Sequence, residues 1–167
     1  MIRDATPADI SAITAIYNHA VLHTTAVWND APATEIQRLQ WLRDRQEAGL
    51  PVIVAVVDGV VAGYASYGPF RPFAGYKDTV EHSVYVDPAM HRRGLGRLLL
   101  EAIIDRARAN GLHVMVGGIA ADNEGSIKLH ERLGFVQTGL MPQVGQKFGK
   151  WLDLAMLQLT LDDRPAP

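Results

Sequence analysis

The hydrophobic positions change their spacing several times along the chain, and each change marks a new element. Apolar residues at helical spacing predict four helices, over residues 7–23, 34–48, 94–110 and 123–133. Apolar, often β-branched runs predict six strands, over residues 51–57, 60–67, 79–86, 113–119, 135–140 and 151–161. Helices and strands alternate, yet Asp58-Gly59 is a strong signal for a tight hairpin. We therefore expect an α/β (α+β) fold, with helices flanking a mixed central β-sheet.

Short polar motifs sharpen the predicted helix ends. Thr6-Pro7 places a capping hydroxyl before a proline at the first helical position, and Asp9 follows in the first turn. Thr34 and Gln37 have the spacing of a capping box. These signals support the two N-terminal helices independently of hydrophobic spacing.

Length and composition indicate how many domains the chain forms. The 167 residues show ordinary globular usage, with 48% hydrophobic and 20% charged residues. We find no internal repeat and no linker-like stretch before the polar end of the chain. We expect one domain over residues 1–161 and a flexible tail over residues 162–167.

Charge and cysteine content exclude several function classes. Sixteen Lys and Arg residues against eighteen Asp and Glu residues give a net charge of −2, so we expect neither a nucleic acid nor a membrane partner. The absence of cysteine excludes disulfides, thiolate metal ligands and a cysteine nucleophile. The histidines show no metal-ligand spacing, so no metal is predicted. With no apolar signal core at the N-terminus and no run of about 20 apolar residues, we expect a cytoplasmic protein.

The most informative stretch leads from a strand through a basic, glycine-bearing loop into the strongest helix. The N-terminus of a helix presents unpaired N–H groups, which bind phosphate well. Gly94 and Gly96 permit close approach to the backbone, and arginines supply charge at positions 92, 93 and 97. The loop is neither a Walker loop nor a dinucleotide-binding loop. The alternative is a glycine-containing helix start with solvated arginines.

Two segments carry a family resemblance. The run His91-Arg92-Arg93-Gly94-Leu95-Gly96, after the strand ending in Asp87-Pro88, resembles the acyl-CoA loop of the GNAT superfamily of N-acetyltransferases. Residues 123–135, from Asn123 to Leu133-Gly134-Phe135, resemble its second signature. The resemblance implies the GNAT acyl-CoA N-acyltransferase fold, with acetyl-CoA as co-substrate. His91 departs from the usual Gln or Arg, with little expected loss because the loop binds through backbone N–H groups.

Further segments resemble a narrower group, the phosphinothricin and methionine sulfoximine N-acetyltransferases. They are residues 17–18, 24–26, 71–73, 81–86 and 144–149. The implied reaction is direct transfer of acetyl from acetyl-CoA to the α-amine of a small amino-acid analogue, in a ternary complex. Methionine sulfoximine, methionine sulfone and phosphinothricin are the leading candidates, with detoxification as the role. A homodimer is expected from the resemblance.

The resemblance also implies a set of site residues. The substrate-binding candidates are Arg71, Pro72, Phe73, Glu81, His82 and Ser83. The cofactor-binding candidates are Val84, Tyr85, Val86, Arg92, Arg93, Gly94, Leu95, Gly96, Arg97 and Asn123. The backbone N–H groups of residues 84–86 are also the candidate oxyanion donors.

Two residues are the catalytic candidates. Glu81 would accept the substrate's proton directly or through a water, and burial in an apolar sheet would raise its pKa. His130 stands where many GNAT enzymes have the tyrosine that protonates the departing thiolate. Each has a plainer alternative. Glu81 could be a solvated strand residue with no catalytic role, and a residue other than His130 could be the general acid. His82 is either a second candidate base or a partly buried structural histidine.

Other candidates have structural alternatives as well. Arg71 suits a substrate carboxylate, because guanidinium and carboxylate form a bidentate pair. Phe73 is a pocket wall, part of a hydrophobic lid, or both, and Asn123 either contacts CoA or only caps its helix. At the level of function, the rivals are acetylation of another amine such as a peptide N-terminus, and a non-catalytic acyl-CoA sensor. A phosphate-binding regulator unrelated to the family ranks third.

Overall fold

The computed structural model describes residues 1–167, whose strands form one mixed sheet in the order β1-β2-β3-β4-β5-β7-β6. The strands are β1 (Ile2–Asp4), β2 (Val52–Val57), β3 (Val60–Pro69), β4 (Thr79–Val86), β5 (Val114–Ala120), β6 (Val136–Lys147) and β7 (Lys150–Thr160). The α-helices are α1 (Ile10–His23), α2 (Glu35–Glu47), α3 (Leu95–Ala109) and α4 (Glu124–Arg132). Three short 3-10 helices are η1 (Pro7–Asp9), η2 (Ala74–Tyr76) and η3 (Pro88–Met90).

The chain divides into two compact units, which are described separately. Unit 1 contains Met1–Tyr67 and Ser83–Ile103, and unit 2 contains Gly68–His82 and Ile104–Pro167. The chain passes between them within β3, β4 and α3, so neither unit is a continuous segment.

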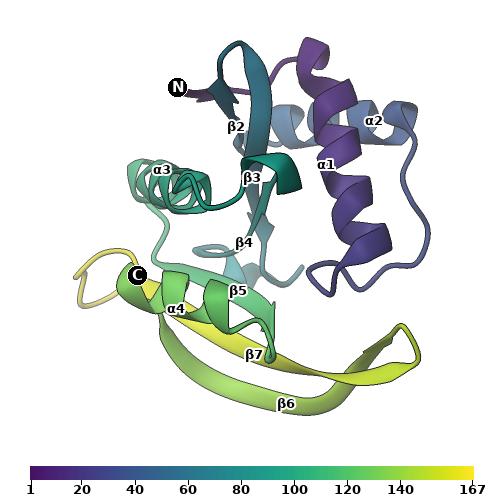
Figure 1. The fold of residues 1–167 in the computed structure, drawn as a ribbon. Coiled ribbons are helices and arrows are strands. Elements are labelled where there is room, and N and C mark those ends of the chain that lie inside the picture. Colours follow the sequence, from purple (N-terminus) through teal and green to yellow (C-terminus); the bar gives the residue numbers. More distant parts are fainter. The chain divides into compact units, whose positions relative to one another are not determined.

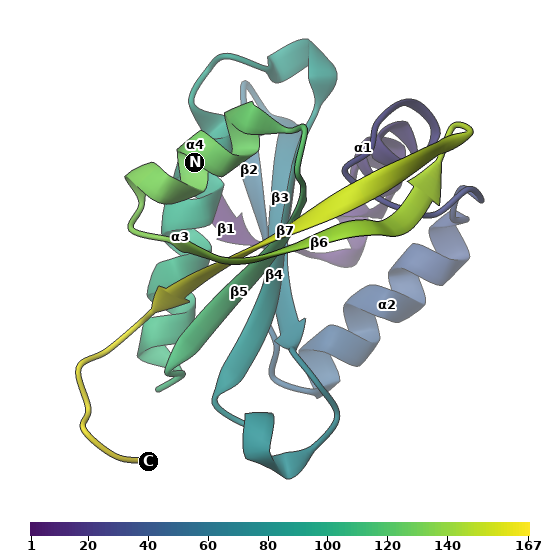
Figure 2. The same ribbon diagram turned by 90° about the horizontal axis from the view of Figure 1, so that it is seen from below.

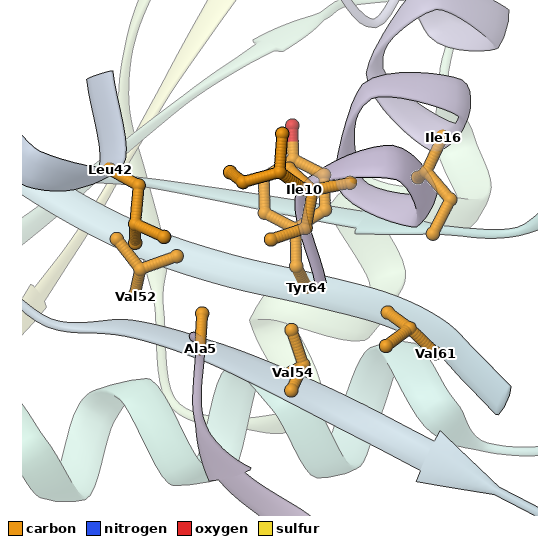
Figure 3. Close-up of a cluster of buried hydrophobic side chains, with 9 residues drawn as sticks. Ala5, Ile10, Ile16, Leu42, Val52, Val54, Val61 and Tyr64 are labelled. Atoms are coloured by element: carbon orange, nitrogen blue, oxygen red, sulfur yellow. The ribbon is translucent and has the colours of Figure 1, made fainter. Parts of the chain in front are cut away.

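Unit 1 is built on the antiparallel strands β1, β2 and β3. Helices α1 and α2 lie on one side of β2 and β3, and the first turns of α3 lie on the other (Figure 1). The core between the strands and the first two helices is made of small and branched side chains around one tyrosine (Figure 3). Its buried members are Ala5, Ile10, Ile13, Ile16, Leu42, Val52, Val54, Val61 and Tyr64. Burial of both faces explains why β2 is an almost continuous apolar run.

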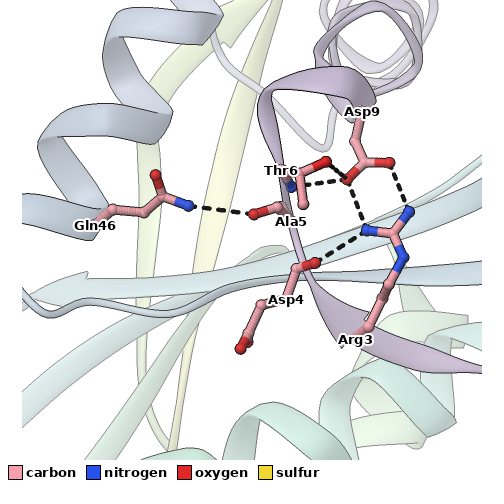
Figure 4. Close-up of polar contacts among 6 residues, drawn as sticks. All are labelled: Arg3, Asp4, Ala5, Thr6, Asp9 and Gln46. Carbon is pink, nitrogen blue, oxygen red and sulfur yellow. Dashed lines mark hydrogen bonds and ion pairs between the residues drawn. The ribbon is translucent and has the colours of Figure 1, made fainter.

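A partly buried ion pair fixes the entry to α1 (Figure 4). The guanidinium of Arg3 donates to both carboxylate oxygens of Asp9, at 2.7 and 2.8 Å. The same carboxylate accepts from the backbone N–H and the hydroxyl of Thr6. These donors, with Arg3 the largest cause, lower the pKa of Asp9 from 3.8 to about 2.

The Asp9→Asn variant is expected to lose about 1–2 kcal/mol of unfolding free energy at neutral pH. Because the pKa of Asp9 is depressed in the folded state, its contribution is complete above pH 3.8 and is lost as the pH falls toward about 2. Denaturant titrations at pH 7, 4 and 2.5 measure this difference. The difference between wild type and variant should be smaller at pH 2.5 than at pH 7, and a constant gap would contradict the assignment.

Unit 2 contains the start of β4 together with β5, β7, β6 and α4. Parallel pairing joins Thr79–Glu81 of β4 to Val114–Val116 of β5, while β5 and β7 pair antiparallel along their length. Strands β6 and β7 form a long hairpin that runs well beyond the end of β5 (Figure 2). In the predicted flexible tail, Asp162 contacts His113 at 2.6 Å, and Arg164 donates to the Gly111 carbonyl.

The predicted elements are confirmed with two corrections. The capping box of Thr34 and Gln37 is present, with both reciprocal hydrogen bonds. The prediction omitted β1, and it ended the sixth strand at Leu140 whereas β6 continues to Lys147. The pairing register shifts around Pro142 and Gly145, so this edge strand can continue through residues that are typical of loops. No helix is both long and apolar enough to cross a membrane.

Candidate functional site

The loop before α3 has the geometry of an anion-binding helix start. Arg92 and Gly94 both have positive φ, at 65° and 75°, which turns the chain sharply into the helix. The first backbone hydrogen bond runs from the Leu98 N–H to the Gly94 carbonyl, so the preceding N–H groups have no acceptor inside the helix. Arg92 and Arg93 are exposed and form no ion pair, whereas Arg97 pairs with Glu101 at 2.8 Å. The loop therefore offers free N–H groups and two uncommitted cations.

The end of β4 leads into this loop and lies close to β3. A Cβ at Gly63 would stand 2.8 Å from the Tyr85 carbonyl oxygen and 3.3 Å from the Val86 Cα, so only glycine fits there. The Tyr85 ring packs on Tyr64, with ring centroids 5.2 Å apart. The Asp87 N–H donates to the Ala62 carbonyl and ties the turn to the same strand. Residues 84–86 are thus held by backbone packing, as a strand that binds a ligand through its main chain requires.

Glu81 is half-buried in unit 2, beside the backbone of β5. A Cβ at Gly118 would stand 3.1 Å from the Glu81 Oε1, so this glycine leaves the room that the carboxylate occupies. Burial raises the pKa of Glu81, and the positive charge of Arg71 partly offsets that rise. A half-buried carboxylate with a raised pKa, close to a cation, has the properties of a general base.

Arg71 lies in the exposed loop between β3 and β4. Its guanidinium stacks 4.2 Å from the ring centroid of Phe70 and donates to the Phe70 carbonyl, but it forms no ion pair. Phe73 is 70% exposed, so it is not part of a closed hydrophobic lid. Pro72 is exposed in the same loop. A cation held by an aromatic ring and lacking a carboxylate partner is available for an anionic ligand.

His82 and His130 form a buried stacked pair. Their ring planes are 17° apart, and their Nε2 atoms lie 3.1 Å from each other. Burial, with a smaller contribution from His130, lowers the pKa of His82 to about 3. Burial also lowers the pKa of His130, whose Nδ1 lies 2.7 Å from the Ser126 carbonyl oxygen. Both ring nitrogens of His130 are therefore already engaged.

Asn123 is the N-cap of α4, and its side chain accepts from the Ser126 N–H at 3.1 Å. The capping alternative is thus present, while the residue itself remains exposed. Ser83 is an exposed residue of β4. The histidines, aspartates and glutamates form no group of three or more that could hold a metal ion.

The predicted site residues fall into two sets, one in each unit. Unit 1 holds Ser83, Val84, Tyr85, Val86, Arg92, Arg93, Gly94, Leu95, Gly96 and Arg97. Unit 2 holds Arg71, Pro72, Phe73, Glu81, His82, Asn123 and His130. The sequence interpretation missed three glycines that make room for site residues: Gly63, Gly117 and Gly118. Glycine inside an apolar strand was the available signal, because it often marks a close approach of another group.

Comparison with known sequences agrees with these features. Residues 13–135 match the family model described as the acetyltransferase (GNAT) family. A relative from Salmonella typhimurium, named L-methionine sulfoximine/L-methionine sulfone acetyltransferase, is 57% identical over 99% of this chain and 97% of its own length. A phosphinothricin N-acetyltransferase from Alcaligenes faecalis is 37% identical over 92% of this chain and 79% of its own length.

Solved structures give the same fold. An acetyltransferase structure from Salmonella typhimurium, yncA with its cofactor acetyl-CoA, has a TM-score of 0.98 at 57% identity and covers 100% of this chain and 96% of that one. A structure from Brucella melitensis named ribosomal-protein-alanine N-acetyltransferase has a TM-score of 0.95 at 49% identity, covering 96% and 99% of the two chains.

Proposed function

The chain belongs to the GNAT family of acetyltransferases, and we propose that it transfers acetyl from acetyl-CoA to the α-amine of a small amino-acid analogue. L-Methionine sulfoximine and L-methionine sulfone are the proposed substrates, because a relative of that name aligns with almost the whole chain. Phosphinothricin ranks behind them, since the phosphinothricin relative is more distant. Residues 1–161 would act as one catalytic domain, and the family match includes residues of both units.

The observation that carries the substrate class is the influence of the Arg71 charge on the nearby Glu81 carboxylate. An α-amino acid has an ammonium and a carboxylate on one carbon, so its enzyme needs a proton acceptor close to a cation. Unit 2 provides both: a carboxylate whose pKa is raised by burial, and a guanidinium that is near enough to counter this rise. Arg71 would bind the substrate carboxylate, and Glu81 would take a proton from the ammonium directly or through a water. Phe73 would form a wall of the side-chain pocket.

Acetyl-CoA fits the residues of the loop before α3. The N–H groups without helical acceptors and the two free arginines match a pyrophosphate, and Gly94 and Gly96 permit close approach. The bound co-substrate supplies the acetyl group. The backbone of residues 84–86 is the proposed binding strand for its arm and the proposed source of the oxyanion N–H groups. Asn123 would add a contact.

The experiment that tests this proposal is identification of the product. The purified protein, acetyl-CoA and L-methionine sulfone should yield a monoacetylated product, with the acetyl group on the α-nitrogen by NMR. Acetylation at any other atom, or unmodified amino acid after prolonged incubation, would contradict the proposal.

A second candidate follows from the Brucella melitensis structure, whose name specifies an alanine of a ribosomal protein as the acceptor. A peptide beginning with alanine, offered together with methionine sulfone, separates the two candidates. We expect the amino acid to be acetylated preferentially, because the N-terminal residue of a peptide has no free carboxylate beside its amine for Arg71 to bind. Preferential acetylation of the peptide would establish the second candidate.

We propose a homodimer, supported by exposed apolar side chains of the β6–β7 hairpin. Six of its apolar side chains are between 46% and 65% exposed: Val136, Leu140, Met141, Val144, Phe148 and Trp151. Exposed apolar side chains on and beside an edge strand favour contact with a second copy. The combined variant Phe148→Ser/Trp151→Glu should sediment as a monomer where the wild type sediments as a dimer. A monomeric wild type at micromolar concentration would contradict the dimer.

The product suggests the biological role. N-acetylation removes the free α-ammonium of the analogue, so the product no longer resembles a natural amino acid, and detoxification is the proposed outcome. The cytoplasm is the proposed location, since acetyl-CoA is the donor and the chain contains no cysteine.

A further inference from the structure

The buried pair of His82 and His130 contains a nitrogen that nothing in the structure satisfies. The rings come from β4 and α4, are 8% and 4% exposed, and are covered edge-on by Phe135. The Nδ1 of His82 is buried without a hydrogen-bond partner. An unpaired buried polar atom costs free energy, so it calls for a functional explanation.

The hydrogen bonds determine where the protons are. A carbonyl oxygen can only accept, so the His130 Nδ1 at 2.7 Å from the Ser126 oxygen must carry a proton. Burial keeps both rings neutral, so the His130 Nε2 has no proton and accepts. The facing Nε2 of His82, 3.1 Å away, must then be the donor. The His82 Nδ1 is consequently a bare acceptor at the end of the pair.

A glycine on β5 leaves the room that the stacked rings of His82 and His130 occupy. A Cβ at Gly117 would stand 2.8 Å from the His82 Nε2 and 3.6 Å from the His130 Cδ2. Any larger residue would displace the ring that donates to His130. Within unit 2, the ring of His82 lies against His130 on α4, Gly117 on β5 and Phe135, and these groups are uncharged. Glu81, the preceding residue of β4, points to the opposite face of the strand.

We propose that His82 is a positioning residue that fixes the proton on His130 and forms, at its own Nδ1, the entrance of a two-histidine proton relay. This proposal rests on the proposed acetyl transfer, in which the substrate nitrogen must give up protons. When a proton binds to the His82 Nδ1, the Nε2 proton of His82 moves to the His130 Nε2. His82 ends neutral, and His130 ends as an imidazolium that donates to Ser126 and to His82. The reverse movement, from the His130 Nε2 to the His82 Nε2 and out from the His82 Nδ1, releases the proton and restores the resting state.

The direction of transfer follows from the position of His130. His130 lies in the last turn of α4, where the helix dipole favours a positive charge. The Ser126 carbonyl also stabilises the protonated form of His130, while His82 has no such acceptor. A charge that enters at His82 is therefore held better on His130. In the resting state, by contrast, the His130 Nε2 has no proton to give to a thiolate.

The proton arrangement can be read directly by long-range ¹H–¹⁵N NMR of histidine-labelled protein. We expect the proton of His130 on Nδ1 and that of His82 on Nε2, with both rings neutral at pH 8. The variants His82→Gln and His130→Gln assign the signals. A proton on the His82 Nδ1, or a proton on the Nε2 of neutral His130, would overturn the proposal.

The relay is tested by the kinetics of His82→Gln. The Gln amide can still donate to His130, but it has no basic nitrogen, so we expect unchanged KM for acetyl-CoA and an about tenfold lower kcat. His113→Gln is the matched control, because His113 pairs with Asp162 away from the histidine pair, and it should keep the wild-type kcat. A folded His82→Gln variant with wild-type kcat and pH profile would show that His82 only packs. If no amino acid were acetylated, the proposed function would fail, while the NMR spectrum would still decide the proton arrangement.

Discussion

The Glu81→Gln variant should lose about 10²–10⁴-fold in kcat with methionine sulfone, the usual range for removal of a general base. The amide has nearly the same shape as the carboxylate but cannot accept a proton from the substrate ammonium. Steady-state release of CoA thiol measures the loss. The acetyl-CoA dissociation constant should not change, since the residues proposed to bind it lie in the loop before α3 and at the end of β4.

The control for this variant is Glu124→Gln. Glu124 is an exposed glutamate of unit 2 that pairs with Lys128 and has no proposed role in the reaction. It should retain wild-type kcat. If Glu81→Gln also retained wild-type kcat, Glu81 would be a structural residue, and the proton would have to leave through another group.

The pH profile gives an independent test of Glu81. The carboxylate must be ionised to act as a base, so kcat/KM should fall as the pH drops through its pKa, which burial raises above the ordinary value. This acidic limb should be absent in Glu81→Gln.

The Arg71→Met variant should raise the KM for methionine sulfone about 10²-fold, because a charge-assisted bidentate pair with the substrate carboxylate is lost. Loss of the positive charge should also raise the pKa of Glu81 further and move the acidic limb of kcat/KM to higher pH. Arg71→Lys keeps the positive charge but loses the bidentate geometry. In this variant the acidic fall of kcat/KM should therefore lie at nearly the wild-type pH, while the KM for methionine sulfone should remain raised.

Lys77→Met is the matched control for Arg71→Met, because it removes another exposed cation from the same β3–β4 connection. Its KM should stay at the wild-type value. A further control is the α-carboxamide of methionine sulfone, on which Arg71→Met and wild type should act equally. An equal KM of the two proteins for the free acid would contradict the assignment of Arg71.

The sequence predicted the parts of the fold that depend on neighbouring residues. The capping box at Thr34 and the hairpin at Asp58-Gly59 are local signals, and both elements are present. The GNAT resemblance is confirmed by the family match and by the solved structures. Strand β1 was missed because three residues are too few to show the alternation of apolar and polar positions that marks a strand. Its partner strand also lies about fifty positions along the chain.

The environment of the site could not be predicted either, because its contacts join segments that are far apart in the sequence. The sequence indicated that Glu81 would have a raised pKa if it lay within the sheet, and the structure confirms the direction of the shift. Nothing local indicated that Gly118 makes room for Glu81, or that Gly117 makes room for the ring of His82. Nor could spacing reveal that both nitrogens of His130 are engaged. These features arise when β4, β5 and α4 meet.

The most direct test of the proposed function is the rate of CoA-thiol release from acetyl-CoA with a panel of amines. The panel contains methionine sulfone, methionine sulfoximine and phosphinothricin, beside a basic peptide and a polyamine. We expect rapid turnover with the first two, slower turnover with phosphinothricin, and background rates with the peptide and the polyamine. Background rates with all three amino acids, from protein that still binds acetyl-CoA, would contradict the proposed substrate class.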